Sequence, residues 1–148
     1  MGGSLKPPSP GGQGKTTFTF PIRVYWEDTD AGGIVFYANW LKFFERARTE
    51  WLRSLGIEQG RLREQSGGIF IVAETSVRYL RPARLDDRLL VTASPGELAR
   101  ASMTLHQSAF HEATGALHAQ GTIRIGWVDA ATLRPARIPR LIMEAMER

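Results

Sequence analysis

The chain has 148 residues, of which 43% are hydrophobic, so its length suits one domain with a real core. It contains no cysteine, which excludes disulfides, thiol nucleophiles and thiolate metal sites. Nineteen Lys and Arg against fifteen Asp and Glu give a net charge of +4. Because the arginines are scattered and usually alternate with acids, a nucleic-acid surface is disfavoured, and a small phosphorylated ligand stays open.

The chain begins with a segment of tail-like composition. Residues 1–15 are rich in Gly and Pro, and we expect them to form a flexible tail ahead of a single domain at residues 16–148. No apolar run approaches the roughly 20 residues of a membrane helix, and the start lacks the apolar region of a secretory signal. We therefore expect a cytoplasmic protein.

A strand followed by a long helix is the next expectation. From Thr16 the alternating, aromatic-rich run predicts a first strand, in which Pro21 indicates an edge or a bulge. Between Tyr37 and Leu55, apolar residues recur at steps of three and four, which predicts a helix with one buried face. We expect Asn39, or the glycines before it, to cap its start and Gly56 to end it. Its apolar residues are Trp40, Phe43, Phe44, Ala47, Trp51, Leu52 and Leu55.

The rest of the chain predicts a loop rich in Glu, Gln, Arg and Gly and then a series of strands. The expected strands are residues 69–80, 88–94, 101–111 and 116–128, with turns at Pro82, Pro95-Gly96 and Thr114-Gly115. A weak helix is expected at residues 138–148. This order favours an α+β class with a mostly antiparallel sheet, one face of which the long helix covers.

Two acids and two glycines stand just before the long helix. Asp28 and Asp30 are two residues apart, and a turn that caps the helix would explain them. However, a cap needs only one glycine, and Gly32-Gly33 costs backbone entropy that close approach of a ligand would justify. The helix start also offers free N–H groups and a positive dipole end. We therefore expect the functional site here.

Other kinds of site have little support in this sequence. His106, His111 and His118 lack metal-ligand spacing, and no serine stands in a Gly-x-Ser-x-Gly elbow. Neither a Walker loop nor Gly-x-Gly-x-x-Gly is present. The aromatic stripe of the helix is expected to be core rather than a stacking platform for bases. The arginine-rich segment at residues 78–88 is a solvated loop by default, although guanidinium groups there suit a ligand phosphate.

The segment at residues 24–50, VYWEDTDAGGIVFYANWLKFFERARTE, resembles the signature of the 4-hydroxybenzoyl-CoA thioesterase type of hotdog-fold enzyme. Within that family it is most similar to the Tol-Pal-associated bacterial acyl-CoA thioesterases. Residues 77–87, VRYLRPARLDD, and the pairs Arg134-Pro135 and Ile138-Pro139 agree with this resemblance. It covers nearly everything from Phe18 to Pro139.

The resemblance implies an antiparallel sheet wrapped around a central helix, with subunits paired as homodimers or homotetramers. It implies hydrolysis of acyl-CoA thioesters without a metal or other cofactor. In that family the second acid is catalytic, which corresponds to Asp30, and the amide at the helix start, here Tyr37, holds the thioester carbonyl. Gly32 and Gly33 would admit the thioester. Many members of the Tol-Pal branch carry His at the position of Tyr37, whereas the hydroxybenzoyl-CoA enzymes carry Tyr.

Two roles for Asp30 follow from this comparison. An aspartate near a helix N-terminus is ionised at neutral pH, which favours nucleophilic attack over general-base activation of water. Arg81 and Arg84 are our choices for the phosphates of coenzyme A. Two other functions stay open: a hotdog binding or scaffold protein without turnover, and a hotdog dehydratase. An acid at position 30 disfavours the first, and the absence of His before or on the helix disfavours the second.

Overall fold

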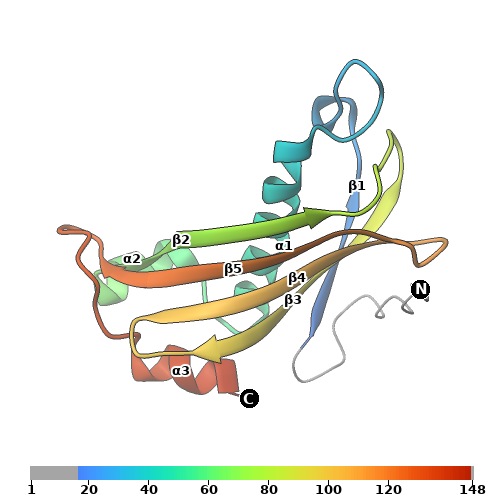
Figure 1. The fold of residues 1–148 in the computed structure, drawn as a ribbon. Coiled ribbons are helices and arrows are strands. Elements are labelled where there is room, and N and C mark those ends of the chain that lie inside the picture. The colour runs from blue at the N-terminus through green and yellow to red at the C-terminus, as the bar shows by residue number, and fades with distance from the viewer. Residues whose placement is uncertain (1–16, 148) are drawn as a thin grey trace.

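A five-stranded antiparallel sheet and one long helix make up most of the fold (Figure 1). A computed structural model describes residues 17–147, so the tail expected at residues 1–15 lies outside the described part. The strands pair in the order β1-β3-β4-β5-β2, and the α+β class is confirmed. Their bounds are β1 Phe18–Arg23, β2 Gly68–Tyr79, β3 Arg88–Leu98, β4 Ser102–His111 and β5 Leu117–Asp129. β1, which contains Pro21, is an edge strand as expected.

Helix α1, Trp40–Ser54, lies across one face of the sheet (Figure 1). Its apolar stripe is buried, and Phe43, Phe44 and Ala47 are 0% exposed. A Cβ on Gly121 of β5 would come within 3.1 Å of Phe44 Cε2, so the glycine lets the ring approach the strand. Gln107 of β4 also ties the helix to the sheet, because its amide nitrogen donates to the carbonyl of Phe44 at 2.9 Å.

The two ends of α1 are formed differently from each other. Gly56 has φ +84°, its N–H donates to Arg53, and the N–H of Ile57 donates to Leu52, which makes the expected glycine C-cap. The Asn39 side chain, in contrast, caps no helical N–H. It donates to the carbonyl of Asp28 at 2.8 Å, so it fastens the preceding loop instead.

Two expectations for the regions between the strands were wrong. The segment expected as a loop contains a helix, α2 (Gln59–Ser66), built from good helix formers with little apolar periodicity. Pro95-Gly96 lies within β3 rather than in a turn. The ladder with β1 ends at Ala93, so no described strand pairs with β3 on that side at Pro95. A Cβ on Gly96 would lie 2.7 Å from Nε2 of His106, so this exposed ring would have to move to admit a side chain.

The chain ends on helix α3, Arg140–Glu147, which agrees with the expected terminal helix. Its residues Ile142, Ala145 and Met146 are buried. Within residues 17–147, no helix is both long and apolar enough to cross a membrane.

We predict opposite stability effects for one substitution at two glycines. Gly56→Ala forces a side chain into φ +84° and should lower the free energy of unfolding by about 1 kcal/mol. Gly60→Ala lies inside α2 with no atom within 4 Å of the new Cβ, and should raise it by up to about 1 kcal/mol. Urea denaturation measures both, and equal shifts of the same sign would contradict the capping role of Gly56.

Candidate active site

Residues 28–36, which we call the acidic loop, form a closed turn ahead of α1. Thr29 and Val35 form an antiparallel bridge, and the N–H of Asp30 donates to the carbonyl of Ile34 at 2.9 Å. The N–H of Gly33 donates to the carbonyl of Asp30 at 3.0 Å. These bonds fix the backbone on both sides of the Asp30 side chain.

Asp28 and Asp30 have different environments. Asp28 ends the short 3₁₀ helix η1, Trp26–Asp28, and is only 2% exposed. Its Oδ2 accepts the N–H of Tyr25 at 2.8 Å, and its carbonyl accepts the N–H of Phe36 at 3.0 Å. Asp28 therefore holds the acidic loop together, whereas Asp30 is exposed to solvent.

The carboxylate of Asp30 is held on one side only. Its Oδ1 accepts the N–H of Gly32 at 2.8 Å, while Oδ2 has no hydrogen-bond partner among the described residues. A Cβ on Gly32 would lie 3.3 Å from that Oδ1, and Gly33 has φ +78°. Both glycines are thus explained by the geometry of the loop itself, and whether they also admit a ligand stays a prediction.

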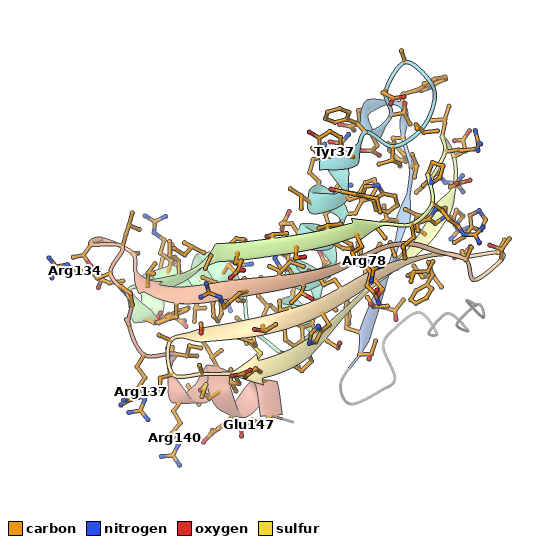
Figure 2. All side chains as sticks on the ribbon, viewed as in Figure 1. Tyr37, Arg78, Arg134, Arg137, Arg140 and Glu147 are labelled. Carbon is orange, nitrogen blue, oxygen red and sulfur yellow. The ribbon has the colours of Figure 1, made fainter. Side chains whose placement is uncertain are left out.

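Tyr37 begins the helical structure that continues into α1. The 3₁₀ turn η2, Tyr37–Asn39, runs directly into the helix, and within the described chain the Tyr37 N–H donates to no other group. This amide is therefore free at the positive end of a long helix. The Tyr37 side chain is 63% exposed and meets the ring of Tyr79 edge-on at 6.1 Å. Figure 2 shows Tyr37 at this end of α1.

A second loop, residues 80–87, lies directly against the acidic loop; we call it the arginine loop. The N–H of Val35 donates to the carbonyl of Ala83 at 2.8 Å, and the N–H of Leu85 donates to Gly33 at 3.1 Å. Arg81 and Arg84 belong to this loop and are exposed. The fold thus brings the two predicted arginines beside the loop that carries Asp30.

His118, whose spacing from the other histidines fits no metal site, lies behind this site. Where β4 supplies Ala109 and Phe110, β5 supplies residues 117–119, so His118 is the extra residue of a β-bulge. It is 5% exposed, and its ring stacks on that of Trp40 at 6.0 Å. Strand alternation groups it with the exposed Gln120, so the sequence pattern gave no signal of this burial.

The sequence and the fold match known proteins. Residues 24–146 match the thioesterase-like superfamily. The chain belongs to this superfamily. It is therefore an enzyme, a thioester hydrolase, and its sheet and helix form a hotdog fold.

Individual thioesterases support this assignment. The chain is 38% identical over 128 residues to the acyl-CoA thioesterase YbgC of Haemophilus influenzae, which covers 86% of this chain and 93% of the relative. A probable thioesterase from Bartonella henselae superposes with a TM-score of 0.77 at 30% identity. The match covers 83% of this chain and 99% of the Bartonella chain. A 1,4-dihydroxy-2-naphthoyl-CoA thioesterase from Synechocystis has the same fold, with a TM-score of 0.82 at 22% identity. The match covers 88% of this chain and 95% of the Synechocystis chain.

We predict that the two acids differ in their effect on stability. Asp28→Ala removes the acceptor of the Tyr25 N–H and should lower the free energy of unfolding by about 1–3 kcal/mol. Asp28→Asn keeps an oxygen acceptor and should lower the free energy of unfolding by less than Asp28→Ala does. Asp30→Ala, at an exposed position, should change it by no more than about 0.5 kcal/mol. Equal losses for Asp28→Ala and Asp30→Ala in urea denaturation would contradict the division of roles.

Proposed function

We propose that this thioesterase hydrolyses acyl-CoA thioesters at Asp30, with the Tyr37 amide as the oxyanion donor. The observation that supports this most directly is the free Oδ2 of Asp30 on a loop that leads straight to an unpaired helix amide. The relative from Haemophilus influenzae is named an acyl-CoA thioesterase, which supports coenzyme A as the thiol. Membership of the Tol-Pal-associated branch is part of the same proposal.

The first step is binding of the thioester carbonyl at the helix start. The carbonyl oxygen accepts the Tyr37 N–H, and the helix dipole stabilises the negative charge that develops there as the carbonyl becomes tetrahedral. One donor of this kind typically contributes about 10²- to 10³-fold in rate. Because the amide is already part of a helix, it does not reorganise during the reaction.

The second step uses the carboxylate of Asp30. Oδ2 attacks the carbonyl carbon, the carbon–sulfur bond breaks, and the coenzyme A thiolate leaves and takes a proton from water. Water then hydrolyses the mixed anhydride and restores the carboxylate. The alternative is that Asp30 accepts a proton from a water that attacks directly. Single-turnover hydrolysis in ¹⁸O-labelled water tests the anhydride route, because label enters Asp30 only when water attacks the Asp30 carboxyl carbon of the mixed anhydride.

We propose that Arg81 and Arg84 bind the phosphates of coenzyme A. Both are exposed on the arginine loop, which is hydrogen-bonded to the acidic loop. Guanidinium groups bind phosphate through paired hydrogen bonds, which suits a pyrophosphate. Three other arginines are less well located for this role: Figure 2 shows Arg134, Arg137 and Arg140 at the opposite end of the molecule from Tyr37.

We also propose that two copies pair along β2. This strand is at the edge of the sheet, so one side of its backbone has no partner among the described residues. It carries exposed apolar side chains, with Ile71 at 40%, Val72 at 50% and Tyr79 at 49%. An apolar unpaired edge is a template for another strand. Since Tyr79 contacts Tyr37, the second copy would also bring its chain beside the proposed site.

We predict that Asp30→Asn abolishes hydrolysis while acyl-CoA binding is retained, because the amide fills the same volume but is neither nucleophile nor base. A thiol-release assay against short, aromatic and long acyl-CoAs measures turnover, and calorimetry measures binding. Glu27→Gln is the matched control, because it neutralises an exposed carboxylate three residues earlier. Parental turnover by Asp30→Asn would refute the proposed mechanism. An inactive parent that binds acyl-CoA would indicate a non-catalytic binding protein.

We predict that Val72→Glu converts the assembly to monomers, because it places a charge at the centre of the paired β2 edges. Light scattering after size exclusion measures the mass. Leu141→Glu on α3 is the control: its side chain is 81% exposed, and its helix is far from β2 in sequence. A parent that is already monomeric, or a Val72→Glu assembly of unchanged mass, would contradict pairing through β2.

A further inference from the structure

A histidine lies at each end of the arginine loop. At one end, the carbonyl of His118 accepts the N–H groups of Leu80 and Arg81 at 2.8 and 3.1 Å. The His118 ring returns to the same segment, with Nδ1 3.3 Å from the carbonyl oxygen of Arg81. At the other end, Nε2 of His111 lies 3.6 Å from Oδ1 of Asp87. The middle of the loop carries the bonds to the acidic loop.

The surroundings of His118 select one form of its ring. A carbonyl oxygen can only accept, so Nδ1 carries the proton that it shares with Arg81. Nε2 is buried and has no hydrogen-bond partner among the described residues. A proton on Nε2 would therefore be a buried donor without an acceptor, and the ring is held neutral.

His111 adopts the opposite arrangement. Its Nδ1 accepts the N–H groups of Ala113 and Thr114 at 3.2 and 3.3 Å, so the proton is on Nε2 and faces Asp87. Asp87 in turn closes the arginine loop, because its Oδ2 accepts the N–H of Arg84 at 2.9 Å. The two ring centroids are 5.7 Å apart, and the two histidines contact opposite ends of the arginine loop.

We propose that His118 and His111 are positioning residues for the thioesterase reaction: by holding the arginine loop, they hold the acidic loop and its Asp30 against the helix start. This inference rests on the proposed function. The route is short, since His118 contacts the carbonyl of Arg81, Ala83 accepts the N–H of Val35, and Val35 lies two residues before Tyr37. His118 also stacks on Trp40, so one ring contacts both the loop and the helix.

The bulge in β5 explains why a histidine suits this position. As the extra residue between Leu117 and Ala119, His118 is released from strand alternation and turns toward Trp40 and the arginine loop. A ring fills the space beside Trp40, and a single N–H satisfies the carbonyl of Arg81. An aliphatic side chain would supply neither the stacking nor the donor.

The proposal implies a defined dependence on pH. Burial lowers the pKa of His118 below its ordinary value of 6.5, and the titratable groups that face it are His111, Asp87 and Arg81. Below pH 6.5 the unfolded chain therefore takes up a proton more readily than the folded one, so folding stability falls as pH falls. Protonation of His118 would place a buried charge behind the arginine loop and loosen it.

Two substitutions at one position test the positioning role. His118→Asn keeps a donor at the place of Nδ1, whereas His118→Phe keeps a ring beside Trp40 but removes the donor. We expect His118→Phe to lower kcat on the order of ten- to hundredfold, the cost of misplacing a catalytic group by about 1 Å, with a smaller change in KM. His118→Asn should restore most of kcat. His106→Asn on β4, at an exposed histidine, should leave kcat unchanged.

A second readout does not depend on turnover. Amide hydrogen exchange of Val35 and Leu85, whose N–H groups join the two loops, should lose protection in His118→Phe and keep it in His118→Asn. Amides of β3 and β4 should keep theirs in both variants. In the parent, protection of Val35 and Leu85 should fall as the pH is lowered below 6.5, and this acid effect should be smaller in His118→Asn.

The possible outcomes separate this inference from the proposed function. A folded His118→Phe with parental kcat and parental protection at Val35 overturns the positioning role, whatever the substrate. Equal loss of kcat in His118→Phe and His118→Asn also overturns it, since a donor at the place of Nδ1 then makes no difference. A third outcome is that the parent protein hydrolyses no acyl-CoA while His118→Phe still lowers the exchange protection of Val35 and Leu85. In that case the proposed function fails, but the role of the histidines in holding the arginine loop is supported.

Discussion

Burial of one helix face against the sheet is the constraint on which the other features depend. The aromatic stripe of α1 supplies much of the apolar area, and each ring buries on the order of 150–250 Å². Contacts such as Phe44 against Gly121 and Gln107 against the Phe44 carbonyl fix the helix laterally. Because the helix cannot shift, its first amide has a defined position in space. The loops before it and beside it are then assembled around a fixed point.

The two loops divide the remaining tasks between them. The acidic loop carries the exposed carboxylate of Asp30, and the buried Asp28 holds that loop closed. The arginine loop has no apolar periodicity of its own, yet its backbone completes the hydrogen bonding of the acidic loop at Gly33 and Val35. Two histidines behind it replace the support that a regular strand would give. In this site the exposed side chains, such as Asp30, are positioned by buried ones, such as Asp28 and His118.

The sequence was sufficient for features that depend on local periodicity. The long helix was predicted because seven apolar residues share one face, and the sheet because turn residues separate β-rich runs. Features that depend on pairing partners were not accessible. Pro95 looked like a turn because its tolerance within β3 depends on where β1 ends. The burial of His118 was not predicted, because it depends on a bulge that no residue pattern indicates. Asp30 was singled out by its glycine neighbours and by resemblance.

The free amide of Tyr37 belongs to the same rigid body as the core aromatics. A helix advances about 1.5 Å per residue, so even a fraction of one residue of sliding moves that amide by a distance comparable to a hydrogen-bond tolerance. Interior positions such as Phe44 and Gly121 are therefore coupled to the position of the Tyr37 amide, the proposed oxyanion donor. Divergence of substrate preference in such a chain is accordingly easier through the two loops, which vary without moving the amide, than through the core.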